Sequence, residues 1–267
     1  MTATETFRKL HAAPGMLVLP NAWDAGSARL IESVGARAIA TTSAGVAWAR
    51  GYPDGDALPI ELLLASAHEI TRVVRVPVTI DIEGGYSDDP PDVGDLAMRL
   101  IDAGVVGINI EDGAGTPELL AAKIEAVRRS TSRAGVDLFV NARCDVYLRG
   151  IESGEAAVEE IARRAARYRD AGCDGLFAPC IVEAADIEAV ASAVAPLPLN
   201  VMLMPDLPAF DALPALGVRR LSCGSAIAEA ALGHARKLAV SLLAGKVDEM
   251  YEVSLDYGSA NELFADR

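Results

Sequence analysis

The feature that most constrains this chain is a regular alternation of short apolar runs with longer amphipathic segments. The runs are rich in Val, Ile and Leu, which is typical of buried parallel strands, and the segments between them have the spacing of helices. Glycine recurs where a helix gives way to a strand, as in Val34-Gly35-Ala36 and Ala171-Gly172-Cys173. The alternation predicts one α/β domain, a (β/α)8 TIM barrel. A doubly wound sheet would also alternate, but no Gly-x-Gly-x-x-Gly follows the first strand.

The predicted elements cover most of the chain. Strands are expected over residues 16–19, 37–42, 77–82, 105–110, 136–142, 175–178, 199–204 and 218–222. Helices are expected over residues 4–11, 24–34, 59–74, 93–103, 117–133, 155–171, 183–194, 209–216 and 226–243, with an irregular loop over 48–58. Residues 1–244 form a single barrel domain in this prediction. Residues 245–267 form a C-terminal extension, either an extra helix or an arm against a neighbouring subunit.

The composition suits such a barrel and argues against several classes of partner. The chain has 267 residues, 51% of them hydrophobic, a length that α/β barrels commonly reach as one domain. Its formal net charge of −14 argues against nucleic acid, whose phosphates need basic patches. Four cysteines without a Cys-x-x-Cys pair, and only three histidines, argue against structural zinc and favour a cytoplasmic protein. We expect no membrane association, because no signal peptide is recognised and no apolar run approaches the ~20 residues of a membrane span.

Acidic side chains gather where the predicted strands end, which is the face of a barrel that carries its chemistry. Asp81 and Glu83 stand at alternate positions of extended chain, so both side chains are expected on one side. Glu111 ends the next strand, Asp54 lies in the loop after the second strand, and Arg143 ends the fifth. Buried carboxylates need a positive partner, and Mg²⁺, or alternatively Mn²⁺, is the natural candidate because it takes oxygen ligands.

These acids could instead cap helices or remain solvated at the strand ends. Asp81 and Glu111 follow apolar runs on neighbouring strands, which favours a site over that alternative.

Five short motifs occur in the order in which the isocitrate lyase / phosphoenolpyruvate mutase superfamily has them, and the chain resembles that superfamily. They are Thr-Thr-Ser-Ala-Gly at 41–45, Gly-Tyr-Pro-Asp-Gly-Asp at 51–56, Asp-Ile-Glu-Gly-Gly-Tyr at 81–86, Asn-Ile-Glu-Asp-Gly at 109–113 and Asn-Ala-Arg-Cys-Asp at 141–145. A similar segment covers residues 217–225. The resemblance extends over residues 17–232, nearly the whole predicted barrel.

The resemblance implies roles for the side chains in these motifs. Asp81 would hold Mg²⁺ directly, and Asp54, Glu83 and Glu111 would hold it mainly through waters. Ser43, Ala44 and Gly45 would cradle the substrate carboxylate, with Arg143 beside its carboxylate or carbonyl group. The candidate site residues are therefore, for catalysis, Asp54, Glu111 and Arg143; for substrate binding, Ser43, Ala44, Gly45, Arg143 and Asn200; and for the metal, Asp81, Glu83, Glu111 and Asp54. Members of the superfamily typically exchange a C-terminal helix between subunits, which implies a homodimer or homotetramer.

The segment after the fourth strand departs from the superfamily pattern. Carbon–carbon lyases carry a gating loop there whose Cys is the acid/base, and mutases carry a loop with Lys and Asn. In this chain residues 113–116 lead at once into a helix, so that loop is essentially missing. The departure argues against isocitrate or methylisocitrate cleavage, which needs a protein base, and it weakens a phosphonomutase.

The remaining expectation is a Mg²⁺-dependent carbon–carbon lyase of decarboxylase or hydrolase type. Its substrate would be a small, oxaloacetate-like 2-oxo acid, and C–C cleavage or decarboxylation would pass through a metal-stabilised enolate. Tyr52, Tyr86 and Cys144 are candidate proton donors. The alternatives are a P–C bond enzyme of the phosphonopyruvate or phosphoenolpyruvate type and a non-catalytic 2-oxo acid binding protein.

Overall fold

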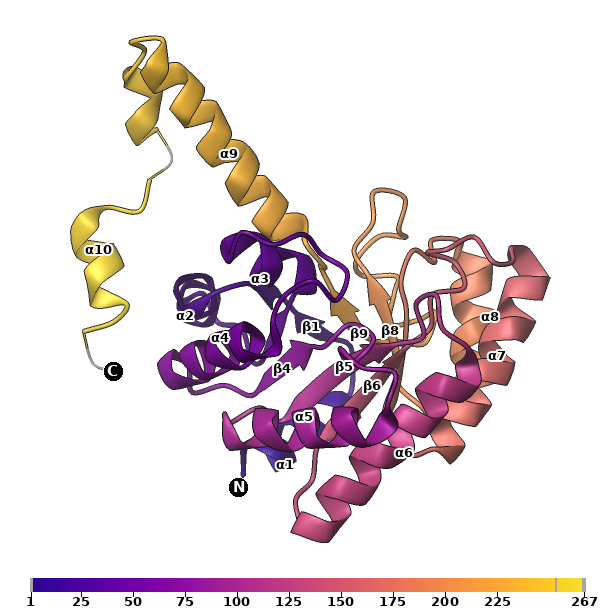
Figure 1. Ribbon diagram of the computed structural model, residues 1–267. Coiled ribbons are helices and arrows are strands. Elements are labelled where there is room, and N and C mark those ends of the chain that lie inside the picture. Colours follow the sequence, from indigo (N-terminus) through magenta and orange to yellow (C-terminus); the bar gives the residue numbers. More distant parts are fainter. Residues whose placement is uncertain (1, 253, 266–267) are drawn as a thin grey trace.

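The strands form one parallel sheet that nearly closes on itself, with helices around its outer face (Figure 1). The structure is a computed structural model that describes residues 2–252 and 254–265. The strands are β1 (Leu17–Leu19), β2 (Asn21–Ala22), β3 (Ile39–Thr41), β4 (Val78–Asp81), β5 (Gly107–Glu111), β6 (Phe139–Arg143), β7 (Gly175–Ala178), β8 (Leu199–Met202) and β9 (Val218–Ser222). Their order in the sheet is β1-β9-β8-β7-β6-β5-β4-β3-β2. The two ends of this order are consecutive in the chain, so the predicted TIM barrel is confirmed.

Pro20 divides the first barrel strand in two. Proline has no N–H for the ladder, so β1 pairs with β9 and β2 pairs with β3 on either side of the break. The carbonyl of Pro20 still accepts a hydrogen bond from the N–H of Ala40 at 3.1 Å. The predicted strand over 16–19 therefore continues beyond the proline, which brings Asn21 to the carboxyl end of the barrel.

The helices follow the predicted alternation. They are α1 (Ala3–Ala12), α2 (Ala25–Ser33), α3 (Ser43–Ala49), α4 (Ile60–Val73), α5 (Pro90–Asp102), α6 (Pro117–Ala134), α7 (Gly154–Asp170), α8 (Ala184–Val194), α9 (Ala226–Leu243) and α10 (Tyr257–Glu262), with a 3-10 turn over Asp248–Tyr251. Asp24 caps α2 as predicted, since its carboxylate accepts the N–H of Ser27 at 2.6 Å.

Two segments differ from the prediction. Residues 209–216 form turns rather than a helix, because Pro214 would stand in the helix interior without an N–H to donate. Residues 43–49, predicted to lead into an irregular loop, form the short helix α3, whose first turn is capped by the hydroxyl of Thr42.

Side chains of the strands alternate between the helices and the barrel interior. Ile80, Ile108 and Val140 pack outward in the main hydrophobic core beneath the surrounding helices. The interior is filled at the amino-terminal end by a second apolar cluster, in which Phe7 of α1 packs with Leu19 and Phe139. Nearer the carboxyl ends many of the inward-facing residues are polar, among them Asp81, Asn109 and Arg143, so the barrel opens there onto charged groups.

The C-terminal segment leaves the barrel. In Figure 1, α9 extends away from the strands, and α10 lies beside the barrel near α2. The carbonyl of Leu263 accepts a hydrogen bond from Arg29 of α2 at 2.6 Å. Among the described residues, no helix is long and apolar enough to cross a membrane.

Candidate active site

A cavity of about 210 Å³ opens at the carboxyl ends of the strands. It brings together five of the predicted site residues, although they come from widely separated parts of the chain: Ser43, Ala44, Asp54, Asp81 and Arg143. The parallel strands explain this convergence, because each βα loop of a barrel leaves from the same face.

Asp81 ends β4 and points into this cavity. Its backbone N–H donates to the hydroxyl of Thr41 at 2.9 Å, and its carboxylate accepts one backbone N–H, that of Glu83, at 3.2 Å. Burial raises the pKa of Asp81, and the negative charge of Asp54 raises it further, while Arg143 lowers it. A buried carboxylate beside a second one, with a single backbone hydrogen bond, has the chemistry to hold a cation.

Glu83 does not share this cavity, contrary to the expected alternation with Asp81. The strand ends at Asp81, and Glu83 takes up a left-handed conformation with φ of 50°. Its carboxylate instead accepts the N–H groups of Gly55 at 2.8 Å and Asp56 at 2.5 Å, and the hydroxyl of Tyr86 at 2.8 Å. Glu83 therefore anchors the loop that carries Asp54.

Glu111 and Arg143 face each other across neighbouring strands. They are register partners on β5 and β6, and the guanidinium lies 2.5 Å from the Glu111 carboxylate. Asp145 accepts two further hydrogen bonds from Arg143, at 2.7 and 3.0 Å. Burial raises the pKa of Glu111, and the Arg143 charge offsets part of that rise. The two carboxylates fix Arg143 at the cavity wall, whereas Glu111 itself does not line the cavity.

Two predicted substrate-binding residues also lie outside the cavity lining. Gly45 is buried in α3, where an added Cβ would meet Thr42 and Trp23 at under 3 Å. Asn200 is fully buried inside the barrel, where its amide group contacts Asn141 and Ser222. Both support the walls of the cavity from behind.

The candidate proton donors do not reach the cavity. Tyr86 donates its hydroxyl to Glu83, Tyr52 packs against the hydrophobic core, and the buried Cys144 faces the helices. Within the described part of the chain, no His, Cys, Lys or Tyr side chain lines the cavity.

Several lining residues were not among the predicted site residues, although Thr42, Asn109, Ser222 and Ser225 lie within the matched segments. Polar ones are Asn21, Thr42, Asn109, Ser222 and Ser225, and apolar ones are Leu148, Phe177, Pro179 and Met202. Asn109 and Ser222 face inward at or near the ends of strands, so the period-2 pattern of each strand was the signal that could have found them.

The lining divides by strand. The polar residues come from β2 to β5 and their loops and from β9, whereas Leu148, Phe177, Pro179 and Met202 come from β6 to β8 or the loops that follow. Arg143 stands at the boundary, and it is the one Lys or Arg among the described lining residues. The cavity thus has a charged side and an apolar side.

The two carboxylates of the cavity suit a magnesium ion that takes its remaining ligands from water or substrate. In residues 2–252 and 254–265, no three His, Cys, Asp or Glu side chains are grouped closely enough to enclose a metal. Mg²⁺ is commonly bound by only one or two carboxylates, with waters and substrate oxygens completing its shell. Asp81 and Asp54 meet that requirement, since both line one cavity and no Lys, Arg or His in the described part of the chain forms an ion pair with Asp81.

The segment after β5 is short, as predicted. Gly115 closes a turn by donating to the carbonyl of Asp112 at 2.7 Å, and Thr116 then caps α6. A hollow of about 360 Å³ lies beside this turn and is bordered by Glu111, Gly113 and the buried Lys123. The turn leads directly into α6, which leaves no long loop between β5 and that helix.

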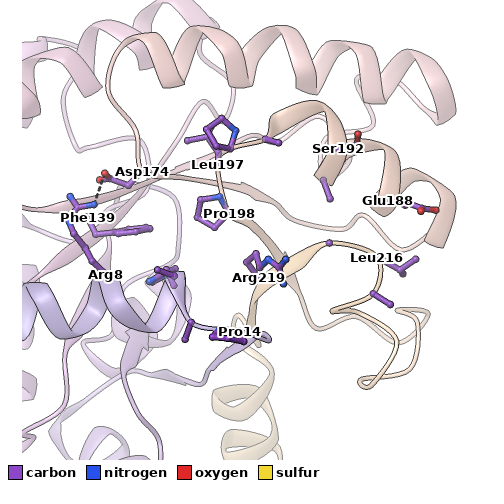
Figure 2. Close-up of a pocket in the computed structure, with 18 residues that line it drawn as sticks. Arg8, Pro14, Phe139, Asp174, Glu188, Ser192, Leu197, Pro198, Leu216 and Arg219 are labelled. Carbon is purple, nitrogen blue, oxygen red and sulfur yellow. Dashed lines mark hydrogen bonds and ion pairs between the residues drawn. The ribbon is translucent and has the colours of Figure 1, made fainter.

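A larger hollow of about 740 Å³ lies at the opposite, amino-terminal end of the strands (Figure 2). Its wall includes Arg8, Phe139 and Pro198. The Arg8 guanidinium forms ion pairs with Asp174, at 2.9 Å, and with Asp137. The smaller cavity is the candidate active site, because it combines the buried carboxylate of Asp81 with Asp54 and Arg143 at the carboxyl ends of the strands.

Comparisons with known proteins agree with the fold. The family model described as phosphoenolpyruvate phosphomutase matches residues 7–243. An uncharacterized protein of Mycobacterium tuberculosis is 38% identical over 225 residues, 82% of each chain. A 2-methylisocitrate lyase of Aeropyrum pernix is 30% identical over 203 residues, which span 72% of this chain and 64% of that enzyme.

A solved structure is similar over nearly its whole length. A Burkholderia cenocepacia protein proposed to be a phosphonomutase superposes with a TM-score of 0.84 at 39% identity, covering 89% of this chain and 98% of that one. The match to the family model extends from α1 to the end of α9. The chain belongs to the phosphoenolpyruvate phosphomutase family, within the isocitrate lyase / phosphoenolpyruvate mutase superfamily.

Proposed function

We propose that this protein is a Mg²⁺-dependent lyase acting on a small, oxaloacetate-like 2-oxo acid, by C–C cleavage or decarboxylation. The observation that carries the proposal is one cavity shared by two carboxylates, Asp54 and Asp81, and a fixed guanidinium, Arg143. Such a cavity offers a cation site and an anion site side by side, which is what a chelating 2-oxo carboxylate needs.

In this proposal Asp81 and Asp54 hold the ion, with Glu83 and Glu111 supporting the surrounding loop and Arg143. Bound Mg²⁺ would act as a Lewis acid toward the 2-oxo group. The Ser43 hydroxyl and the N–H of Ala44, which no carbonyl within α3 can reach, would bind the carboxylate. Asp145 and Glu111 keep Arg143 charged and oriented toward the same ligand.

The apolar side of the cavity favours a carboxylic substrate over a phosphonate. A phosphonate group would add charge where Phe177 and Met202 offer no donor, and Arg143 is already shared between two carboxylates. Carbon dioxide, by contrast, is uncharged, so apolar surroundings impose no cost of burying a charge on it. The electron pair of the broken C–C bond would pass to the 2-oxo oxygen, and solvent water would return a proton to C3.

The absence of a His, Cys, Lys or Tyr side chain among the described lining residues supports the same reaction. Cleavage that starts by removing a hydroxyl proton needs a positioned base, whereas decarboxylation needs none. This distinguishes the proposal from isocitrate-type cleavage.

Two alternatives have observations of their own. The similarity to the Burkholderia cenocepacia protein favours a P–C bond enzyme acting on phosphonopyruvate or phosphoenolpyruvate. The short turn at Gly113–Thr116 favours a 2-oxo acid binding protein without turnover, because nothing there would shield an intermediate.

A turnover screen with and without Mg²⁺ separates the three. Oxaloacetate, its C3-substituted relatives and phosphonopyruvate would be supplied in parallel, with product release followed by NMR. We expect Mg²⁺-dependent conversion of an oxaloacetate-type acid. Conversion of phosphonopyruvate alone would favour the P–C enzyme, and Mg²⁺-dependent binding without conversion of any acid would favour the binding protein.

We also propose that the protein is a homodimer or homotetramer in which α9 packs on a second copy. Along this helix of 18 residues only Ala228 is buried, while Leu232, Val240 and Leu243 are 54%, 61% and 88% exposed. Figure 1 shows α9 extending away from the barrel. Contact with a neighbouring subunit would cover this apolar surface.

A further inference from the structure

Asn109 is a buried amide in the wall of the candidate active site. It lies on β5 beside Asp81 of β4, its register partner, and it is 4% exposed. It lines the same cavity as Asp54, Asp81 and Arg143. Either its carbonyl oxygen or its NH₂ group faces the cavity, and the neighbouring side chains decide which.

Arg220 fixes the orientation of this amide from below. Its Nη2 atom lies 3.1 Å from the Oδ1 atom of Asn109. A guanidinium can only donate, so the Asn109 atom that faces it must be the carbonyl oxygen. Arg220 is 1% exposed, and burial lowers its pKa to about 9, an effect that the charge of Asp81 partly offsets.

A chain of amides fixes the same orientation independently. The Nδ2 atom of Asn200 faces two backbone carbonyls, those of Val201 at 2.6 Å and Arg220 at 3.3 Å, which can only accept. The Oδ1 atom of Asn200 therefore faces Asn141 at 3.2 Å, and Asn141 uses Nδ2 to donate to it and to Oδ1 of Asn109 at 2.9 Å. Both ends of the network thus assign the Asn109 oxygen to the interior.

The Nδ2 group of Asn109 is left on the cavity side, and no partner for it occurs among the described residues. An amide N–H cannot bind a cation, so this group does not belong to the metal ligands. It requires an acceptor, and the acceptor next to Asp81 would be an oxygen of the bound ligand.

We propose that Asn109 donates a hydrogen bond from Nδ2 to the 2-oxo oxygen of the bound acid, and that Arg220 is the positioning residue that holds the amide in this orientation. The inference rests on the proposed function, because it takes the ligand to be a 2-oxo acid. The bond strengthens as negative charge develops on that oxygen. This role also gives a reason for the burial of Arg220 inside the barrel, where the Oδ1 atom of Asn109 is its side-chain hydrogen-bond partner among the described residues.

Oxalate, a planar dianion shaped like the enolate of a 2-oxo acid, is a suitable probe. Isothermal titration calorimetry would measure its affinity at saturating Mg²⁺ for the wild-type protein and for Asn109→Ala and Asn109→Asp. We expect oxalate affinity to fall by about 10- to 100-fold in the Ala variant, as for a hydrogen bond to a charged group, and further in the Asp variant, which replaces the donor by an acceptor. Mg²⁺ affinity measured without oxalate should stay within about threefold in the Ala variant, the spread of context-dependent effects.

Arg220→Lys and Arg220→Met test the positioning role. The Lys variant keeps a donor and should retain the oxalate affinity that the Met variant loses. Equal oxalate affinities in the two variants would contradict the positioning role of Arg220.

A measurement on the unaltered protein makes the test independent of variant folding. The side-chain NH₂ protons of Asn109, assigned by NMR, should shift downfield when oxalate is added with Mg²⁺. If the wild-type protein binds oxalate but these protons do not move and Asn109→Ala keeps full affinity, the role of Asn109 is wrong while the proposed function stands. If the wild-type protein binds no oxalate with Mg²⁺, the proposed function fails, and this inference with it.

Discussion

Replacement of Glu83 distinguishes a loop anchor from a metal ligand. The structure gives its carboxylate three donors, the N–H groups of Gly55 and Asp56 and the hydroxyl of Tyr86. Glutamine can preserve all three contacts, since its oxygen can accept both N–H groups and its NH₂ group can donate to the Tyr86 hydroxyl. Alanine preserves none. The pair of variants therefore separates geometry from charge.

The loss in free energy of unfolding expected for each variant follows from the same contacts. Each hydrogen bond to a charged group contributes about 1.5 kcal/mol or more, but burial of the carboxylate opposes this, as its raised pKa indicates. We expect Glu83→Ala to lower the free energy of unfolding by about 3 kcal/mol and Glu83→Gln to lower it by about 1 kcal/mol. Loss of the anchor also releases the loop that carries Asp54, so Mg²⁺ affinity should fall in the Ala variant.

Urea unfolding and calorimetric titration with Mg²⁺ provide the two readouts. An anchor predicts that Glu83→Gln keeps nearly the wild-type Mg²⁺ affinity. If the Gln variant loses as much Mg²⁺ affinity as the Ala variant while remaining equally stable, Glu83 is a ligand and the reasoning from its contacts is refuted.

Other predictions concern the barrel interior and the tail. Burial lowers the pKa of His11 to about 3 in the folded protein, so on acidification the unfolded chain is protonated first, near pH 6.5. Above that pH the free energy of unfolding does not depend on His11, and at pH 5 it should be about 2 kcal/mol lower. His11→Leu should remove that part of the acid slope in urea titrations, and an unchanged slope would exclude this cause. Tyr168→Phe removes one of two side-chain donors to the buried Asp112 and should reduce the free energy of unfolding by about 1–2 kcal/mol. An unchanged free energy of unfolding would show that this hydrogen bond does not stabilise the fold. Val240→Glu with Leu243→Glu should reduce the mass measured by light scattering, and an unchanged mass would argue against α9 as the contact.

Most of the fold could be predicted because each local signal agreed with the barrel. Asp24, Gly35 and Gly172 mark helix ends, and apolar runs mark strands, so these boundaries follow from short-range chemistry. The failures are local as well. Pro214 overrides a helical pattern, and Thr42 starts a helix in a segment that contains a glycine.

The site could be predicted only in part. Asp81, Asp54 and Arg143 were predicted from motifs at strand ends, and the structure gathers them into one cavity. The positions of Glu83 and Asn200 could not be inferred, because they depend on a left-handed residue at the strand end and on a network that crosses the barrel. Asn109 requires knowledge of its donors Arg220 and Asn141, which are distant in the sequence.

The central claim is that Asp81 makes ligand binding depend on a divalent ion. Calorimetric titration of oxalate, with and without Mg²⁺, into the wild-type protein and the isosteric Asp81→Asn variant tests it directly. We expect Mg²⁺-dependent binding that the substitution weakens by at least about tenfold, or roughly 1.4 kcal/mol. Binding that is equally tight without Mg²⁺, or that Asp81→Asn leaves unchanged, would contradict it.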